Sequence, residues 1–598
     1  MKSWIITVLM LMAIGCQKGE RDGRTRMNGS QGQGAPESPV PPGKLIGEAD
    51  PIADSAAVPG GTFVTWGSSF PKSLNVFLDN NSFSAEVMGL MFESLISLHP
   101  TDNRFIGVLA ESWTISEDKR TFTFTLHEQA RWSDGKPVSA EDIQFYYDVI
   151  MDPVNLTSVF RVGLKRFSRP EVVDGKTVRI TAKEKHWRNF HEAGGMVAFP
   201  KHVWKDSNFN RQNFKFPVVN GPYSLKEVRK NRYVLLARRP DWWGRIKKFN
   251  QYKYNFHQVK FKFMTDRNKA LEAFKKGDWD AYPIYTSSIW VKKTAGLEQV
   301  KKGWVVRQKV INKEPIGFQG MAINLRREKF QDPRVREALC HLLNRELMNE
   351  KLMFDQYFLL NSYYPDLYPG NVNPGVPLRK YDPDRARKLL SEAGWMVDSR
   401  GKLGKDGKPF AITFITFSAD HRHLNIYIED MKKVGVDARM EQLSLSSVRK
   451  RLDKHDFDMY WIAWGAGRLR DPESIWHSST ASQESTNNIP GVSDAVVDSL
   501  IELQKTEMDI NKRNEILKAI DVRLNRIIPY VLLWQSDHHR VLYWNKFGTP
   551  RYVFDKYNRE DVIVTYWWHD REKGERLEAA RKTDRRLPLE PAVVEYSQ

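Results

Sequence analysis

The sequence predicts a mixed α/β protein with more than one lobe, and three observations support this prediction. The chain has 598 residues, and at roughly 150 residues per domain it is too long for a single domain. Hydrophobic residues make up 41% and charged residues 28%, which is typical of a globular chain with a sizeable core. Segments with a two-residue hydrophobic period alternate with segments of helical period. This interleaving indicates α/β lobes whose sheets are mostly covered.

The first predicted elements are two strands and a helix. Residues 62–66 (TFVTW) alternate as a short strand, and residues 121–126 (TFTFTL) give the clearest strand pattern in the chain. Ser139 is a candidate N-cap, because two acidic residues follow it where a first helical turn favours negative charge. The apolar residues within 143–150 predict the buried face of that helix.

Strands and helices continue to interleave in the rest of the body. Residues 268–276 predict a helix that Gly277 ends. The further predicted strands are 232–238, 259–263, 411–417 and 459–463, and the further predicted helices lie within 332–352, 383–393 and 425–433. No repeat of fixed period occurs, so a solenoid is excluded.

Composition and motifs argue against an enzyme and against a nucleic-acid-binding protein. Lys and Arg number 92 and Asp and Glu 73, a formal net charge of +19, but the basic residues are scattered and form no run that would bind nucleic acid. The chain contains none of the GxSxG, HExxH, Walker or GxGxxG motifs. The adjacent pair His538 and His539 is interpreted as part of a polar turn and not as a metal site, since no third ligand has suitable spacing. We therefore expect no catalytic residue, no metal and no cofactor.

The N-terminus resembles a bacterial lipoprotein signal. Residues 4–14 form an apolar run that is too short to cross a bilayer, and Ala13, Ile14 and Gly15 lead to Cys16. This pattern predicts cleavage before Cys16 and acylation of its thiol, with residues 1–15 as the signal peptide. The alternative is an ordinary secretory signal followed by a coincidental cysteine. The second cysteine, Cys340, lies in an apolar-periodic stretch and is expected to be a buried free thiol.

Aromatic residues gather around glycines in the stretch 458–471 (DMYWIAWGAGRLRD). The glycines allow a close backbone approach, which an incoming peptide strand can use for main-chain hydrogen bonds. Trp461, Trp464 and Trp476 are candidate walls for ligand side chains. The alternative for each tryptophan is a place in the core.

Ordered motifs then resemble the family 5 extracellular solute-binding proteins, the peptide, dipeptide and nickel receptors of ABC importers. The motifs are FESL at 92–95, LAESW at 109–113, RWSDGKPVSAED at 131–142, NGPY at 220–223, DPRVREAL at 332–339 and AGW at 393–395. The resemblance runs from about residue 61 to about residue 566. Within the family, NLRR at 324–327, FDQYFLLNSYYP at 354–365 and YWNKFG at 543–548 most resemble the branch that binds oligopeptides and microcin-C-type peptides.

The resemblance implies a two-lobed periplasmic-binding-protein fold, type II, of the large peptide-binding class with an inserted subdomain. The implied parts are a flexible tether (16–61), lobe I (62–80, 216–312 and 541–570), the insert (81–215), lobe II (313–540) and a charged C-terminal tail (571–598). The ligand is expected in a cleft between lobes that close about a hinge.

The resemblance carries family binding positions onto part of this chain. Trp464, Gly465 and Ala466 match the segment whose backbone pairs with bound peptide. The Asp that often follows and binds the peptide amine is Gly467 here, with Asp471 as a nearby substitute. The remaining implied ligand contacts are Asn80, Asn81, Tyr223 and Trp461.

The function implied is that of a lipid-anchored receptor that captures peptides and delivers them to the permease subunits of an ABC importer. We expect a monomer in the cell envelope, in the periplasm or at the cell surface, with Cys16 holding it to a bacterial membrane. Two alternatives stay open: the same fold with a sugar or metal chelate as ligand, and a repurposed surface interaction protein. Salt-sensitive binding to an acidic polymer would favour the last.

Overall fold

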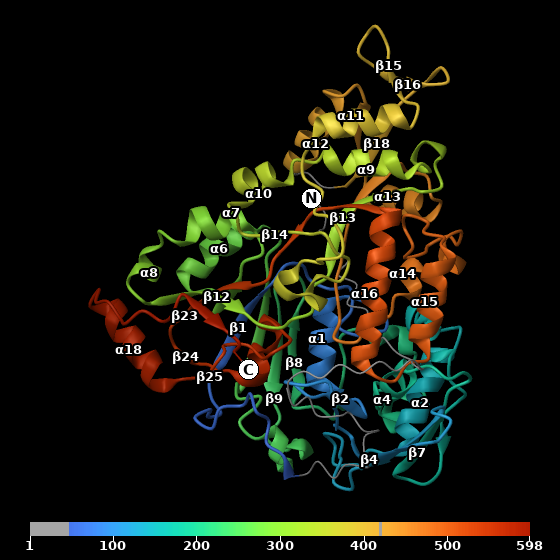
Figure 1. The fold of residues 1–598 in the computed structure, drawn as a ribbon. Coiled ribbons are helices and arrows are strands. Elements are labelled where there is room, and N and C mark those ends of the chain that lie inside the picture. The colour runs from blue at the N-terminus through green and yellow to red at the C-terminus, as the bar shows by residue number, and fades with distance from the viewer. Residues whose placement is uncertain (1–46, 418–420, 598) are drawn as a thin grey trace, which may run out of the picture. The chain divides into compact units, whose positions relative to one another are not determined.

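A computed structural model describes residues 47–417 and 421–597 (Figure 1). Within them the chain divides into two compact units: unit 1 runs to Glu314 and resumes at His538, and unit 2 is Pro315–Asp537. Helices and strands alternate in both units, which confirms the α/β prediction. The predicted signal peptide and Cys16 lie outside the described residues. Within the described ranges, no helix has the length and apolar character needed to cross a membrane.

Unit 1 is built on a large mixed sheet. Its strands, in spatial order, are β26 (Val593–Glu595), β12 (Val305–Ile311), β23 (His539–Trp544), β11 (Ala281–Pro283), β1 (Thr62–Gly67), β10 (Gln258–Phe263), β9 (Tyr233–Arg238) and β8 (Tyr223–Arg229). The first predicted strand is central in this sheet, where it lies parallel to β10. Phe63 on β1 is buried, and its ring stacks on Phe256 at a centroid distance of 5.0 Å. This contact shows that β1, the strand predicted from residues 62–66, lies in the core of unit 1.

The end of the chain differs from the predicted charged tail. Residues Arg571–Lys582 form helix α18, in agreement with the charged pattern, but β26 then joins the large sheet parallel to β12. The side chain of Tyr596 is 4% exposed and its ring lies 4.4 Å from that of Tyr552. The residues of β26 are therefore a sheet edge, and the β-branched Val593 and Val594 favour this strand.

The predicted tether also ends earlier than residue 61. Asp50 and Ile52 are buried in unit 1. Asp50 forms an ion pair with Lys253 at 2.8 Å, with both side chains at most 7% exposed, and accepts a hydrogen bond from the hydroxyl group of Tyr566 at 3.0 Å. Glycine and proline content alone did not predict this contact, because it depends on two residues far away in the sequence.

A smaller sheet within unit 1 contains the predicted strand 121–126, which is β5 (Thr121–Leu126). It lies between β4 (Ala110–Ile115) and β7 (Thr177–Thr181), and β6 (Glu171–Val172) completes the sheet. Helix α2 (Ala140–Met151) packs against β6 and β7 (Figure 1). The predicted N-cap is confirmed: Ser139 and Asp142 form a capping box.

The other elements of unit 1 are short strands and helices. The strands are β2 (Ile96–Leu98), β3 (Phe105–Gly107), β24 (Phe547–Gly548) and β25 (Trp568–His569). The helices are α1 (Ser82–Met91), α3 (Ser158–Leu164), α4 (Arg188–Gly194), α5 (Lys201–Trp204), α6 (Arg267–Lys276), α7 (Ser287–Ile289), α8 (Glu298–Lys301) and α17 (Ile563–Tyr566). Helix α6 ends as predicted, because Gly277 takes the left-handed conformation with φ of 90°.

Unit 2 is built on a sheet with the order β19 (Asp437–Gln442), β18 (Ala411–Thr416), β20 (Met459–Trp464), β13 (Phe318–Ile323) and β21 (Tyr530–Leu532). Its helices are α9 (Pro333–His341), α10 (Arg345–Met353), α11 (Pro383–Glu392), α12 (Arg422–Lys432), α13 (Leu445–Asp453), α14 (Glu473–Trp476), α15 (Ala495–Lys505) and α16 (Ile510–Ile527). The predicted helical stretch 332–352 is thus two helices, since Asn344 caps a new one.

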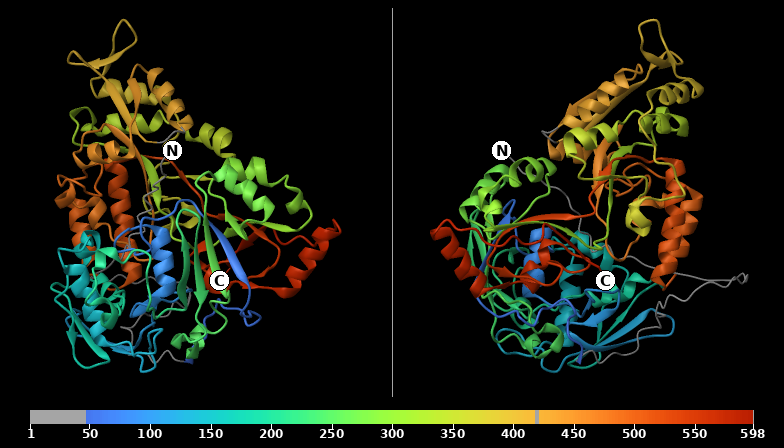
Figure 2. Two further views of the ribbon diagram at one scale, coloured as in Figure 1. Left: turned by 180° about the vertical axis from the view of Figure 1, so that it is seen from behind. Right: turned by 60° about the vertical axis from the view of Figure 1, so that its left-hand side comes forward.

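Short strands complete unit 2. They are β14 (Phe358–Leu359) paired with β22 (Trp534–Gln535), and a small sheet of β15 (Met396–Val397), β16 (Leu403–Lys405) and β17 (Lys408–Pro409). The hairpin of β15 and β16 projects beyond α11 and α12 in each view (Figure 2). Cys340 on α9 is a buried free thiol, as predicted.

Candidate ligand-binding site

Strand β20 of unit 2 has one edge that is only half paired. On one side it pairs with β13 along its whole length, from Met459 opposite Ile323 to Trp464 opposite Phe318. On the other side its register with β18 covers only Met459 and Tyr460. The second edge of residues 461–464 therefore has no strand partner among the described residues. Main-chain groups at an open edge of this kind are able to pair with an added strand.

The side chains of β20 alternate between the core and an exposed face. Tyr460 and Trp464 are buried, whereas Ala463 is exposed and Trp461 is 36% exposed. The indole nitrogen of Trp461 donates a hydrogen bond to Oε1 of Gln319 at 3.2 Å. Trp461 therefore offers a broad apolar surface whose orientation a neighbouring strand holds.

The side chain of Trp464 packs in the core of unit 2 and offers little exposed surface to a ligand. It is 8% exposed, and its Nε1 donates to the hydroxyl oxygen of Tyr530 at 3.0 Å. Burial raises the pKa of Tyr530 well above its usual range. Tyr530 thus stays a neutral hydroxyl group, and the Trp464 side chain is held in the core by both packing and a hydrogen bond.

The loop after β20 is open on one side. Gly465 is exposed, and a Cβ atom built on it meets nothing within 4 Å. Gly317, just before β13, fixes the other side: a Cβ atom there would lie 1.8 Å from the carbonyl oxygen of Trp464. Sequence reasoning missed Gly317, whose only signal is a glycine directly before a strand. Ala466 follows in a half-buried position.

The charged residues after this loop already have partners in unit 2. Oδ1 of Asp471 accepts a hydrogen bond from the backbone N–H of Glu473 at 2.9 Å. Arg470 is 9% exposed and forms an ion pair with Asp366. Asp471 thus supports the start of α14, and the charge of Arg470 is balanced by a carboxylate.

Trp476 lies in the core and forms no wall for a ligand. It is 1% exposed, its ring stacks on Phe318 at 5.7 Å, and its Nε1 donates to the hydroxyl oxygen of Tyr364 at 3.0 Å. The alternative of a core role, stated for each tryptophan, is correct here because Trp476 fills the space between α15, α16 and the sheet.

The other predicted contacts lie in unit 1. Asn80 is exposed, whereas the side chain of Asn81 caps α1 by accepting from the N–H of Ser84 at 2.9 Å. Tyr223 is 0% exposed, and its hydroxyl group donates to the carbonyl oxygen of Phe256 at 2.9 Å. Of these three residues, only Asn80 has a side chain without a hydrogen bond to another described residue. Burial in the core leaves Tyr223 no surface for a ligand in this structure.

Unit 1 also holds a group of interacting titratable side chains. Nε2 of His539 lies 3.1 Å from Oε2 of Glu314, and Arg559 pairs with the other oxygen of Glu314 at 2.9 Å. Burial raises the pKa of Glu314 to about 7, and burial together with Arg559 lowers the pKa of His539 to about 3. On helix α1, burial and the neighbouring carboxylates of Asp561 and Glu560 raise the pKa of Glu86 to about 8. His539 thus interacts with a protein carboxylate.

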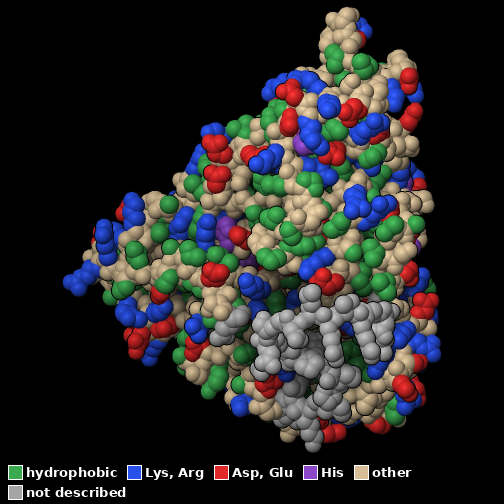
Figure 3. Space-filling view, in the orientation of Figure 1, with side chains coloured by type: hydrophobic (Ala, Val, Ile, Leu, Met, Phe, Trp, Pro, Cys, Tyr) green, Lys and Arg blue, Asp and Glu red, His purple; other side chains and the backbone are tan. Residues whose placement is uncertain are grey.

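Charges of both signs are mixed on one face of the protein. The face in Figure 3 shows Lys and Arg side chains mixed with Asp and Glu side chains, without one large basic patch.

Residues 104–487 match the family described as bacterial extracellular solute-binding proteins, family 5 middle. The chain belongs to this family. It is 26% identical over 560 residues to the probable peptide-binding protein YejA of Agrobacterium fabrum. The alignment covers 86% of this chain and 87% of the relative. The family resemblance inferred from the ordered motifs is therefore confirmed.

Solved structures show the same mixed α/β periplasmic-binding-protein fold. The oligopeptide-binding protein AppA of Bacillus subtilis, in complex with a nonapeptide, has a TM-score of 0.68 at 20% identity, with 86% of this chain and 99% of that chain covered. NikZ of Campylobacter jejuni, in complex with Ni(L-His), has a TM-score of 0.67 at 21% identity, with 85% and 99% covered. As a member of this extracellular family, the protein is a non-enzymatic substrate-binding component of an ABC importer.

Proposed function

We propose that this protein captures peptides for import and that the open edge of β20 binds their backbone. The observation that carries this proposal is the half-paired strand: residues 461–464 keep one edge without a strand partner among the described residues, and an exposed glycine follows. A peptide in extended conformation has the alternating N–H and C=O groups that such an edge pairs with. The similarity to YejA supports the same ligand class.

The ligand contacts that we propose lie around this edge. Gly465 and Ala466 offer main-chain groups, Trp461 offers an apolar wall, and Trp464 holds their backbone in place. Asn80 of unit 1 stays a predicted contact. Asp471 stays a predicted amine anchor, since its Oδ1 accepts one hydrogen bond from the N–H of Glu473 and a carboxylate can accept more than one. Because main-chain hydrogen bonds do not depend on the side chains of the peptide, we expect the protein to bind peptides of many sequences.

Native mass spectrometry of the purified protein tests the ligand class. We expect peptides of a narrow length range to leave the protein on denaturation. Release of a sugar or of a metal chelate would contradict the peptide proposal. A sugar is the second candidate ligand, because the exposed indole of Trp461 suits stacking on a sugar ring.

A glycine substitution tests the place of binding. Gly465→Val puts a branched side chain into the open space beside the edge, so peptide-induced thermal stabilisation should be lost while the unliganded protein melts as before. Gly175→Val is the control, because a Cβ atom on Gly175 also meets nothing within 4 Å. An unchanged peptide response of Gly465→Val would remove this loop from the site.

We further propose the lipid anchor at Cys16, permease subunits as partners, a monomeric state and the oligopeptide branch of the family. These proposals rest on the signal-like N-terminal residues 1–16 and on family membership.

A further inference from the structure

Unit 2 contains a hollow whose lining includes no residue of β20. Its volume is about 300 Å³, and its lining comes from the start of α9, the loop at 375–379 and the last turns of α16. The lining residues are Pro333, Glu337, Gly375, Val376, Pro377, Arg379, Val522, Asn525, Arg526 and Ile528. This volume lies at the lower end of the range for small-molecule sites.

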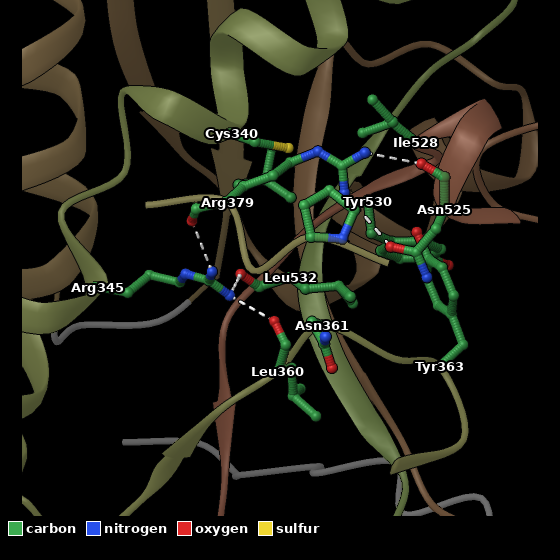
Figure 4. Close-up of a pocket in the computed structure, with 12 residues that line it drawn as sticks. Cys340, Arg345, Leu360, Asn361, Tyr363, Arg379, Asn525, Ile528, Tyr530 and Leu532 are labelled. Carbon is green, nitrogen blue, oxygen red and sulfur yellow. Dashed lines mark hydrogen bonds between the residues drawn. The ribbon is translucent and has the colours of Figure 1, made fainter. Parts of the chain in front are cut away.

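An inner chamber of about 20 Å³ shares part of the lining of this hollow. Four residues line both spaces: Pro377, Arg379, Asn525 and Ile528. The chamber has room for about one water molecule, so only the outer hollow holds a larger ligand. Figure 4 shows the guanidinium groups of Arg345 and Arg379 on the walls of the chamber, which also include Cys340 and Tyr363.

The buried positive charge beside the hollow lacks a carboxylate partner. Arg345 is 4% exposed and donates to the carbonyl oxygens of Leu360, Leu532, Leu533 and Arg379, and to no acidic side chain among the described residues. Arg379 donates to Asn525, to the main-chain oxygen at 2.8 Å and to Oδ1 at 3.3 Å. Its Nε is buried and has no hydrogen-bond partner among the described residues. A buried N–H group without an acceptor costs about 1–3 kcal/mol.

The rim adds a further cation. Arg526 on α16 is exposed and forms no ion pair with any described residue. The one acidic lining residue, Glu337, lies 3.3 Å from Arg385, which offsets its charge. The hollow therefore has an excess of positive charge, and Val376, Pro377 and Val522 supply apolar surface beside it.

We propose that this hollow binds a small carboxylate with an apolar body. The carboxylate lies against Arg379 and Arg526, because guanidinium groups match carboxylate geometry. The apolar body lies against Val376, Pro377 and Val522. Apolar walls favour an organic anion over phosphate, since phosphate would lose hydration without gaining apolar contact. This site is independent of the proposed peptide function.

Calorimetric titration of the full-length protein with benzoate tests the proposal, with benzamide and inorganic phosphate as comparison ligands. We expect millimolar or tighter binding of benzoate, and binding of benzamide and phosphate weaker by about tenfold or more. Equal binding of benzoate and benzamide, or no benzoate binding up to about 10 mM, would overturn the proposal.

Two variants locate the binding. Val522→Trp fills the hollow from α16 and should abolish benzoate binding, while Arg526→Gln should weaken it about threefold to tenfold. Lys512→Gln is the matched control, because it removes the same charge from an exposed position on the same helix that forms no ion pair with a described residue. If Val522→Trp fails to fold, the comparison of Arg526→Gln with Lys512→Gln still decides. Equal benzoate affinity in these two variants, or retained binding in a folded Val522→Trp protein, would place the anion elsewhere.

Discussion

Gly317 lies so close to the carbonyl oxygen of Trp464 that a Cβ atom on residue 317 would come within 1.8 Å of it. Gly317 lies directly before β13, and Phe318, the first residue of that strand, is the register partner of Trp464 at the end of the antiparallel strand β20. Because Gly317 has no side chain, the backbone of β20 continues into the loop at Gly465 without bending away from β13. A residue that touches no ligand thus sets the position of the proposed peptide-binding edge.

Gly317→Ala should therefore displace this loop. Overpacking against backbone costs about 1–3 kcal/mol, and we expect peptide affinity to fall together with the free energy of unfolding. Chemical denaturation and peptide titration measure both quantities. Gly465→Ala is the control, because its Cβ atom meets nothing within 4 Å, and it should change the free energy of unfolding by less than about 0.5 kcal/mol. A Gly317→Ala protein with unchanged stability and affinity would contradict the role of the close approach.

Asp50→Ala should destabilise unit 1 strongly. It removes one partner of the buried pair with Lys253 and leaves an uncompensated cation, which costs about 3–5 kcal/mol. Denaturant unfolding measures the loss. The control is Glu48→Gln, which breaks a solvent-exposed pair with Arg104 and should cost less than about 1 kcal/mol. Equal effects of the two substitutions would show that residue 50 belongs to the tether after all.

The carboxyl group of Glu86 should make stability fall as the pH rises. Its pKa in the folded protein is about 8, raised from 4.5 by burial and by Asp561 and Glu560. Because the folded state favours the protonated form, Glu86 makes its full contribution to the free energy of unfolding below pH 4.5, and this contribution is lost as the pH rises through about 8. The melting temperature of the Glu86→Gln variant, relative to that of the original protein, should therefore be higher at about pH 9 than at about pH 5. A constant difference between the two proteins over this range would contradict the shifted pKa.

Cys16→Ser should release the protein from the membrane fraction, because acyl chains on the cysteine thiol are the proposed anchor. Detergent phase partition followed by immunoblotting measures the distribution. Cys340→Ser is the matched control: this thiol is buried and unpaired, so its loss should leave the membrane association unchanged. A Cys16→Ser protein that stays in the detergent phase would argue against lipidation.

Local patterns in the sequence were sufficient to predict many of the elements. The alternation in 121–126 predicted β5 with its bounds, Ser139 predicted the start of α2, and Gly277 predicted the end of α6. These predictions succeeded because a strand period, an N-cap and a left-handed glycine each depend on a few adjacent residues. The segment 464–466 was selected in the same way, through glycine beside aromatic residues, and its role in ligand binding stays a prediction.

The sequence by itself therefore determined the helix and strand pattern and, through ordered motifs, the family of binding proteins. Only the tertiary structure decided which candidate residues keep a free surface. It placed Tyr223 in the core, made Asn81 a helix cap, and left one edge of β20 without a strand partner beyond Tyr460 among the described residues. Burial and strand pairing depend on residues that are distant in the chain, such as Phe256 for Tyr223, and one sequence read along its length does not contain those contacts.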